Sequence, residues 1–416
     1  MKTFRLLICT GLLVSLTALS AQEFSKEASN RYVGSSTYTF TSEVPGQLII
    51  ENIRGDITVI GEQTERIEIV ESITIRSKSE ERARDLFEDV SASVQQISSG
   101  EEPLVIRMIG KHSRKRDVSF DYTVVVPVIF SALVKTRGGD LNVNNIQGEI
   151  DITTAGGDIT VADLNGRISA NTSGGDIEAA KLGGRVVLTT SGGDIDVEDI
   201  QGELGANTAG GDISVEDVHG TVSVNTSGGD IDLSDIEGRE VIARTSGGDI
   251  TAENLSSDID LSTTGGDIQM TNITGDAEAS TSGGDIEMET IRGDVRVWTS
   301  AGSITGEHLE GSLDARTSAG DIIIAKIWNR ELENHDIDLK TLAGDIELML
   351  PRNFSATFSA RSMSPGGKSA EAIVTDFPLN ITASRAMVRA KGITGDGQFN
   401  VNLETSIGCI TISWED

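Results

Sequence analysis

The sequence predicts an all-β protein, a single β-solenoid of about 12 regular 18-residue coils with further coils at both ends. Three observations support this: a motif that recurs every 18 residues, aliphatic residues at fixed positions in each repeat, and 46 Gly with only 4% aromatic residues in a chain of 416. Few aromatic residues indicate a narrow aliphatic core, and regularly spaced Gly residues indicate tight turns. Stacking such coils would pair neighbouring strands and bury their shared apolar face.

The repeated motif is Thr-x-Gly-Gly-Asp-Ile, and its Asp recurs in steps of 18 residues, with one step of 19 and a last step of 24. Counted from this Asp, apolar residues fall at +1, +3, +6, +10 and +12, Gly is usual at +8, and Thr stands four residues before the Asp. The alternation predicts two or three short strands per coil with the Thr facing inward. Both Gly positions should form corners, because Gly adopts positive φ at no steric cost. The extra residue at Arg239-Glu240 should cause a local bulge.

The ends of the array follow the same template. Residues 48–59 and 405–412 fit it, so an outlying coil is expected on each side of the regular repeats. Open strand edges promote polymerisation and must be covered. Ser77 with Glu80 resembles a capping box before an amphipathic stripe, which predicts an N-terminal capping helix within residues 77–98. The non-repetitive residues 351–397 predict a C-terminal β cap.

The chain is therefore expected to have four parts: a signal peptide at 1–21, N-terminal strands and the capping helix at 22–137, solenoid repeats at 138–350, and C-terminal capping strands at 351–416. Lys2 and Arg5 precede an apolar run that ends in Ala-Leu-Ser-Ala at Ala21, as in secretory signal peptides. No later segment resembles a transmembrane helix. We expect export to the periplasm, the cell surface or the medium. Cys409 would then be the only cysteine, buried or, alternatively, paired with another chain.

Taken together, these elements resemble the bacterial "putative adhesin" family of β-strand-repeat proteins, a domain family of unknown function. The resemblance is carried by the N-terminal strand, the helix, the Asp-Tyr-Thr-Val-Val-Val-Pro strand at 121–127, the Gly-Asp-Ile coils and the closing segment at 395–412. It implies a solenoid in the cell envelope or at the surface with an adhesive role, and it provides no catalytic residues to transfer.

The net charge limits the possible partners. The chain has 65 Asp and Glu against 34 Lys and Arg, a formal charge of -31 that lies mostly in the repeats, so we exclude nucleic acid as a partner. Stacking would align the Asp carboxylates at about 5 Å, where they repel one another. Either they accept hydrogen bonds that fix the Gly-Gly corner, or they bind a row of Ca²⁺, the one cofactor the sequence suggests. The candidate ligands are Asp158, Asp176, Asp194, Asp212, Asp230, Asp249, Asp267 and Asp285.

Two other segments are candidate sites. The 24-residue step adds a loop in which Trp328, His335 and Asp336 could mark a ligand site, although such insertions are more often packed loops. The basic run of Lys111, Arg114, Lys115 and Arg116 is either a solvated hairpin tip or a contact for anionic lipid or cell-wall polymer.

The function predicted from the sequence is that of a non-enzymatic, exported, adhesin-like solenoid whose acidic faces form a binding or spacing surface. Its partner would be an envelope or surface component, either protein or glycan. One alternative is a filament or scaffold formed by end-to-end stacking, so the chain could be a monomer or an end-to-end oligomer. A carbohydrate-active enzyme using Glu333, His335 or Asp336 is a further alternative, disfavoured because the regular coils lack the long loops that wall a cleft.

Overall fold

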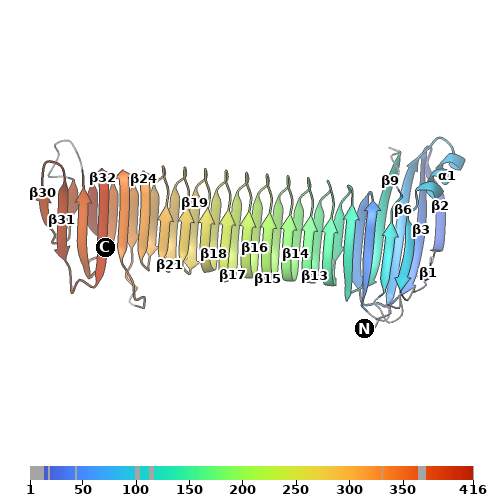
Figure 1. The fold of residues 1–416 in the computed structure, drawn as a ribbon, viewed down its shortest axis with the longest axis horizontal. Coiled ribbons are helices and arrows are strands. Elements are labelled where there is room, and N and C mark those ends of the chain that lie inside the picture. The colour runs from blue at the N-terminus through green and yellow to red at the C-terminus, as the bar shows by residue number, and fades with distance from the viewer. Residues whose placement is uncertain are drawn as a thin grey trace, which may run out of the picture. The chain divides into compact units, whose positions relative to one another are not determined.

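The computed structural model describes residues 14–16, 19–42, 45–98, 104–111, 117–329, 331–363 and 372–415. The chain forms two compact units, Met1–Gly193 (unit 1) and Asp194–Asp416 (unit 2). Each unit is built almost entirely of stacked strands (Figure 1). The predicted all-β solenoid is confirmed.

Unit 1 contains the N-terminal strands, the helix and the first regular coils. Its elements are β1 (Val14–Leu16), β2 (Leu19–Ala28), β3 (Arg31–Thr41), β4 (Gly46–Ile53), β5 (Asp56–Glu62), β6 (Arg66–Arg76), α1 (Glu80–Val90), β7 (Ser93–Ser98), β8 (Val105–Ile109), β9 (Val118–Pro127), β10 (Phe130–Thr136), β11 (Leu141–Asn144), β12 (Gln147–Thr153), β13 (Ile159–Asn171) and β14 (Ile177–Thr189). Strand β2 thus begins before the expected cleavage site at Ala21.

The coils of unit 1 stack in parallel with the predicted 18-residue register. Ile159 of β13 pairs with Ile177 of β14, and both side chains are buried. The outlying coil is confirmed, because β4 pairs with β10 and β5 with β11. Beyond this coil, β8 and β9 add a further parallel layer, and β6, β3 and β2 follow β9 as antiparallel strands.

Helix α1 covers the inward face of β3 and β6. Its N-cap is Ser79, whose side chain accepts a hydrogen bond from the backbone amide of Arg82, so the helix begins later than the predicted start at Ser77. Phe87 is buried against Gly34, where an added Cβ would lie 2.4 Å from the Phe87 ring. The predicted capping helix is confirmed, but it ends at Val90 because the following residues form β7.

Unit 2 holds the remaining repeats and the C-terminal cap. Its strands are β15 (Ile195–Asn207), β16 (Ile213–Asn225), β17 (Ile231–Arg244), β18 (Ile250–Ser262), β19 (Ile268–Thr274), β20 (Ala277–Ser280), β21 (Ile286–Arg292), β22 (Val295–Trp298), β23 (Ile304–Leu309), β24 (Leu313–Ala319), β25 (Ile322–Lys326), β26 (Ile337–Ala343), β27 (Ile346–Pro351), β28 (Ala356–Ser362), β29 (Ile373–Thr375), β30 (Asn380–Ala383), β31 (Val388–Ile393), β32 (Phe399–Ile407) and β33 (Ile410–Glu415). The predicted bulge at residues 239–240 is confirmed by a register shift between β17 and its neighbours.

The Gly-Gly corner is fixed by the buried Thr of each repeat. The Oγ1 of Thr226 donates to the carbonyl of Gly211 at 2.8 Å and accepts from the amide of Gly229 at 3.3 Å. An added Cβ on Gly229 would lie 2.1 Å from the same carbonyl, whereas one on Gly228 would have 3.5 Å of clearance. The predicted inward Thr is therefore confirmed. The second Gly is needed for close approach between coils, and the expected positive φ is wrong for Gly229.

Two other turns complete each coil. The Gly at +8 has positive φ in five of the repeats, for example Gly202 (φ 143°) and Gly275 (φ 147°), which confirms the corner in those repeats. The residue at +5 adopts the left-handed conformation without being Gly, for example Asp217 (φ 54°) and Asn254 (φ 59°). Asn and Asp tolerate this conformation better than most residues, so their frequency at +5 was a sequence signal for this turn.

The C-terminal end of unit 2 confirms the closing coil. Strand β32 lies between β26 and β28, and β33 lies between β27 and β29. Strands β31 and β30 then extend the cap in antiparallel order. Cys409 lies in the Asp position of this coil and is exposed, so the expectation of a buried cysteine is wrong. The Asp position is a corner, and corner side chains point to solvent.

Candidate binding face

The Asp residues of the repeat form a hydrogen-bonded ladder along the Gly-Gly corner. In unit 2 the amide of Asp230 donates to Oδ1 of Asp212 at 2.8 Å, and the amide of Asp249 donates to Oδ1 of Asp230. Each carboxylate thereby fixes the next coil, which offsets part of the repulsion between neighbours. In unit 1 the ladder includes Asp158 and Asp176, and in unit 2 it includes Asp194, Asp212, Asp230, Asp249, Asp267 and Asp285.

These are the eight residues considered as calcium ligands. Within the described ranges, no group of three or more His, Cys, Asp and Glu side chains is arranged to hold a metal ion. One oxygen of each acceptor carboxylate is already used by a backbone amide. Calcium binding at this corner stays a prediction.

A second ladder, which sequence reasoning missed, follows the +8 corner of unit 2. The amide of Asp276 donates to Oδ1 of Asp258, and the amide of Asp294 donates to Oδ1 of Asp276, both at 2.9 Å. The amide and hydroxyl of Ser312 continue the ladder onto Asp294. The signal was an Asp directly after the corner in consecutive repeats. The ladder begins at Asp258 within the undivided strand β18, and from the next coil on the long strand divides into two, as in β19 and β20.

An open groove of about 610 Å³ lies along this second ladder. Each coil contributes a ladder residue and the outward residue two positions later, and Arg296 is the single basic residue of the described lining. The outward residues pair across the strands in register, from Asp260 through Glu278 and Arg296 to Asp314. Along the groove the strands are therefore evenly spaced, and the outward side chain differs from one strand to the next.

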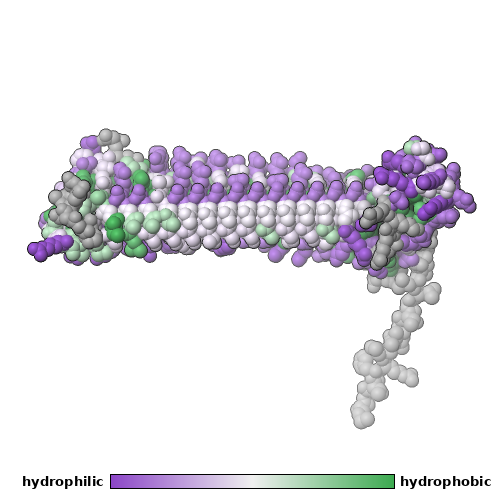
Figure 2. Space-filling view, turned by 90° about the horizontal axis from the view of Figure 1, so that it is seen from above, coloured by the Kyte–Doolittle hydropathy of each residue, from purple (hydrophilic) through white to green (hydrophobic). Residues whose placement is uncertain are grey.

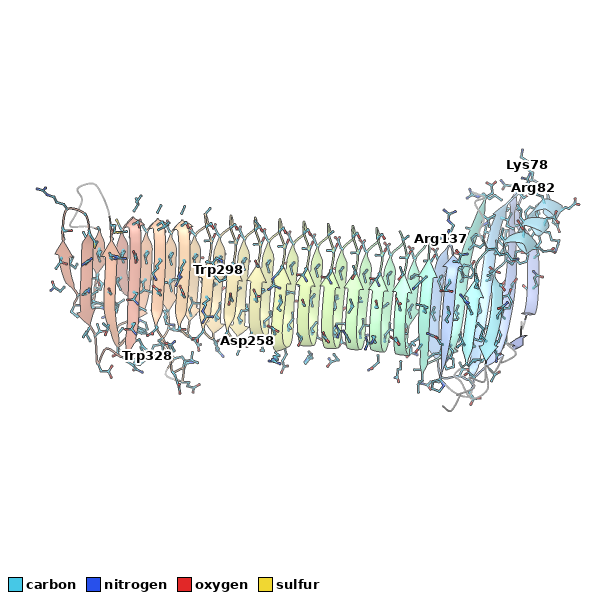
Figure 3. All side chains as sticks on the ribbon, in the orientation of Figure 1. Lys78, Arg82, Arg137, Asp258, Trp298 and Trp328 are labelled. Atoms are coloured by element: carbon cyan, nitrogen blue, oxygen red, sulfur yellow. The ribbon has the colours of Figure 1, made fainter. Side chains whose placement is uncertain are left out.

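Trp298 stands beside the groove on the outward face of β22. Its side chain is 43% exposed, and within the described residues its ring has no aromatic or cation–π partner. Its cross-strand neighbours are Ser280 and Arg316. Figure 3 shows Trp298 on the sheet face, while Asp258 lies at the lower rim of the same unit. Exposed Trp on a flat polar face offers a stacking surface.

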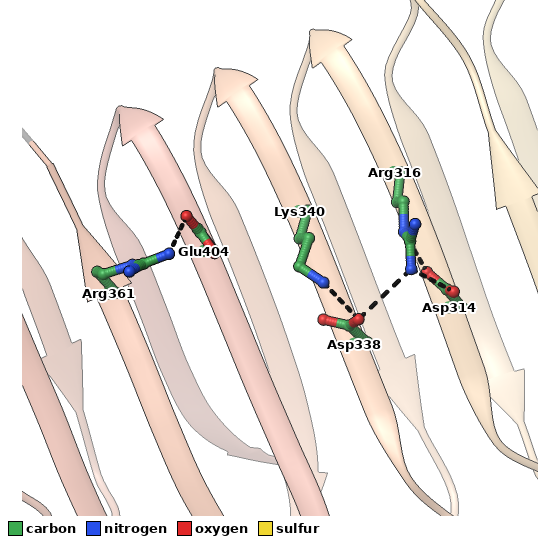
Figure 4. A network of polar contacts seen from close by, with 6 residues as sticks. All are labelled: Asp314, Arg316, Asp338, Lys340, Arg361 and Glu404. Atoms are coloured by element: carbon green, nitrogen blue, oxygen red, sulfur yellow. Dashed lines mark hydrogen bonds and ion pairs between the residues drawn. The ribbon is translucent and has the colours of Figure 1, made fainter.

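A network of ion pairs continues the same face toward the C-terminal cap (Figure 4). Arg316 contacts Asp314 at 2.7 Å and Asp338 at 3.6 Å, and Lys340 contacts Asp338 at 2.5 Å. Arg361 of β28 pairs with Glu404 of β32. Of these residues, Asp338, Lys340, Arg361 and Glu404 border a second depression of about 410 Å³, which shares Asp338 and Asn402 with the groove. From above, much of unit 2 is a pale band of near-neutral residues bordered by hydrophilic rows (Figure 2).

The loop of the 24-residue step packs against the cap. His335 is fully buried, its ring meets Phe399 at 5.0 Å, and its Nε2 lies 2.8 Å from the carbonyl of Asn329. Burial lowers the pKa of His335. Trp328 is half-buried with its ring edge-on to Phe354. Asp336 instead lines the groove and accepts a hydrogen bond from the amide of Asn400.

Lys326 is a buried cation that sequence reasoning missed. Its side chain occupies an inward position opposite Leu309, and its Nζ donates to the carbonyls of Glu310 and Gly311. The ammonium thus provides a hydrogen-bond donor to two carbonyls just before the insertion begins. Burial lowers the pKa of Lys326 to about 7. In the strand register, this Lys takes a repeat position that other coils fill with an apolar residue, such as Leu309.

The basic run of unit 1 lies mostly outside the described residues. Lys111 is described and exposed, whereas Arg114, Lys115 and Arg116 are not described. In the described ranges no helix is long and apolar enough to cross a membrane.

The repeats match the family model described as Toastrack DUF4097 over residues 198–305 and 239–413. The two matches together cover more than half of the chain. The chain belongs to the Toastrack DUF4097 family. The resemblance drawn from the order of the elements is thereby confirmed at the level of a domain family of unknown function.

Two solved structures are similar to this Toastrack chain in arrangement. A "putative cell adhesion protein" from Clostridium sporogenes has 8% identity and a TM-score of 0.16, with 92% of this chain and 100% of that chain covered. A "putative adhesin" from Parabacteroides merdae has 13% identity and a TM-score of 0.24, with 76% and 95% covered. No curated protein matches the sequence.

Proposed function

We propose that this Toastrack protein is a non-enzymatic binding protein of the bacterial envelope or surface, and that the outward face of unit 2 engages an extended ligand across successive coils. The observation that carries the proposal is the exposed ring of Trp298 beside the 610 Å³ groove. A ligand lying along the face would meet equivalent positions at each strand spacing of about 4.8 Å. Exposed aromatic side chains are enriched where proteins bind partners.

The two ends of the chain support binding by the face. In unit 1 the inward face of the outermost strands is covered by α1, and in unit 2 the closing coil is paired on both sides. In the part of the chain that the structure describes, the outermost element at neither end is a regular coil of the repeat, which opposes the stacking of further copies. Export and the identity of the envelope component are part of this proposal.

Sedimentation with isolated cell envelopes tests the proposal. We expect purified protein to sediment with envelopes, and Trp298→Ala to weaken the apparent affinity about thirtyfold, since truncating a central aromatic anchor commonly costs about 2 kcal/mol or more. Trp414→Ala is the matched control, because Trp414 is 40% exposed but lies on β33 in the cap. Equal sedimentation of wild type and Trp298→Ala would contradict the proposal.

A further inference from the structure

The outward residues that follow Trp298 across the paired strands are mostly basic toward the cap. Across successive paired strands, the row continues from Trp298 through one glutamate and four cations: Arg316, Lys340, Glu404, Arg361 and Arg389. We call the four cations of this row, with Lys391, the basic row. Paired strands lie about 4.8 Å apart, so Arg361 is roughly 19 Å from Trp298 along the face.

The basic row is neutralised only at its start. Arg316 and Lys340 are paired with Asp314 and Asp338, and Arg361 is paired with Glu404. Arg389 contacts the sulfur of Met387, and neither Arg389 nor Lys391 has a carboxylate partner among the described residues. The cap end of the basic row therefore carries uncompensated positive charge.

The strand register concentrates this charge. Arg361 of β28 and Arg389 of β31 stand directly opposite each other in an antiparallel pair, and Lys391 is opposite Ser359, two residues away on the same face. Like charges in directly opposed positions destabilise a sheet. In a chain with a net charge of -31, such a cluster is not explained by the general composition.

The cluster also borders a cavity. The charged residues that line the depression of about 410 Å³ are four cations, Lys340, Arg361, Arg389 and Lys391, and two carboxylates, Asp338 and Glu404. The carboxylates pair with Lys340 and Arg361, so Arg389 and Lys391 supply the excess positive charge. Guanidinium groups bind planar carboxylates and phosphates through paired N–H donors. The cavity thus offers convergent donors to an anionic group.

We propose that the ligand of this face is an anionic saccharide chain, with one acidic group in the depression at Arg361, Arg389 and Lys391. Its next sugar rings extend along the row toward Trp298. This rests on the proposed function, and it adds the class of ligand. A saccharide is favoured because the row joins an exposed aromatic ring, suited to stacking on the apolar face of a sugar, to side chains that bind carboxylate or phosphate.

Binding of three probes to the purified full chain tests the proposal: oligomers of a polyuronate, neutral gluco-oligosaccharides of equal length, and vesicles that contain phosphatidylglycerol. We expect the polyuronate to bind more tightly than the neutral oligomer, with an affinity that falls as salt is raised. The double variant Arg389→Ala/Lys391→Ala should weaken polyuronate binding about tenfold or more, because hydrogen bonds to charged groups are worth about 1.5–3 kcal/mol. Neutral oligomer binding should change little.

A charge-matched control is available in unit 1. Lys135 and Arg137 are exposed and, like Arg389 and Lys391, two residues apart, so Lys135→Ala/Arg137→Ala removes the same charge from unit 1 and leaves the lining of the depression unchanged. This control should bind the polyuronate as the wild type does. Equal polyuronate affinity of wild type and the Arg389/Lys391 variant would overturn the proposal, and so would binding to the vesicles alone. If Trp298→Ala weakens envelope binding but the polyuronate does not bind, the ligand class is wrong and the proposed function stands.

Discussion

Glu71 should make the N-terminal cap less stable as pH rises. The residue is fully buried on the inward face of β6, where its Oε1 accepts a hydrogen bond from the amide of Ala92 at 2.9 Å. Burial raises the pKa of Glu71 to about 7, although the Ala92 amide, the Tyr122 hydroxyl and Lys111 act in the opposite direction. An acid whose pKa is raised on folding favours the folded state when it is protonated.

The size of the effect follows from the shift. The unfolded pKa is 4.5 and the folded pKa is about 7, so stability should be highest below pH 4.5 and fall until the pH has passed about 7. At 1.36 kcal/mol per pKa unit, the loss is about 3 kcal/mol at most. Glu71→Gln removes the charge at nearly constant shape. The variant should therefore be more stable than the wild type above pH 7 by up to this amount.

Hydrogen exchange at the amides of β6 and α1, measured from pH 4 to 8 and corrected for the intrinsic rate, follows the local opening of this cap. Wild-type protection should decrease relative to Glu71→Gln as pH rises. Glu68→Gln is the control, because Glu68 lies on the same strand with its side chain partly exposed and paired with Arg66. If wild type and Glu71→Gln lose protection in parallel over this range, the assignment of the buried charge is refuted.

Three further outcomes test the repeat. Gly229→Ala should lower the thermal midpoint strongly, by an overpacking cost of about 1–3 kcal/mol or more, whereas Gly228→Ala, with 3.5 Å of clearance, should be nearly neutral; equal midpoints would refute the close-approach argument. Asp230→Asn keeps an oxygen acceptor for the next amide, so without calcium its thermal midpoint should equal that of the wild type. If millimolar calcium raises the midpoint of the wild type but not that of the variant, the result favours a calcium ladder. Because the pKa of Lys326 falls from 10.5 to about 7 on folding, stability of unit 2 should rise between pH 7 and 10, and Lys326→Met should abolish that rise in urea titrations.

The repeat could be predicted because its period fixes the register. A slip of one residue would expose every aliphatic side chain, so an 18-residue spacing of Ile permits a single alignment, as in Ile213 opposite Ile231. The inward position of the Thr could be predicted from the same alignment, because the Thr is an even number of residues away from the inward aliphatic side chains that precede it. The sequence did not show the reason for the second Gly, because the distance from Gly229 to the carbonyl of Gly211 depends on the stacked neighbour.

The face of unit 2 was harder to predict than its core. Trp298 and Arg316 are neighbours only because their strands pair. Arg361 and Arg389 belong to the same row because, in the cap, β28 pairs with β32 on one side and with the antiparallel β31 on the other. A period of 18 residues aligns positions within the regular repeats, but it assigns no register to residues 351–397, which have no period. The Asp position of the template already indicated an exposed corner, so the exposure of Cys409 was predictable from its place in the motif.

At the N-terminal end of unit 1 and the C-terminal end of unit 2, the order of the strands in the sheet differs from their order in the sequence. This order affects which surfaces are available for binding. In unit 1, β4 and β5 lie between β8 and β9 on one side and β10 and β11 on the other, and in unit 2, β32 and β33 lie between β26 and β27 and the strands β28 and β29. The coil that most resembles a repeat is therefore internal at each end. Beyond it, unit 2 presents β30, an antiparallel strand of four exposed residues that offers a poor template for a parallel coil of a second copy. The repetitive surface left available is the outward face, and it is there that a ligand can contact the same backbone spacing many times.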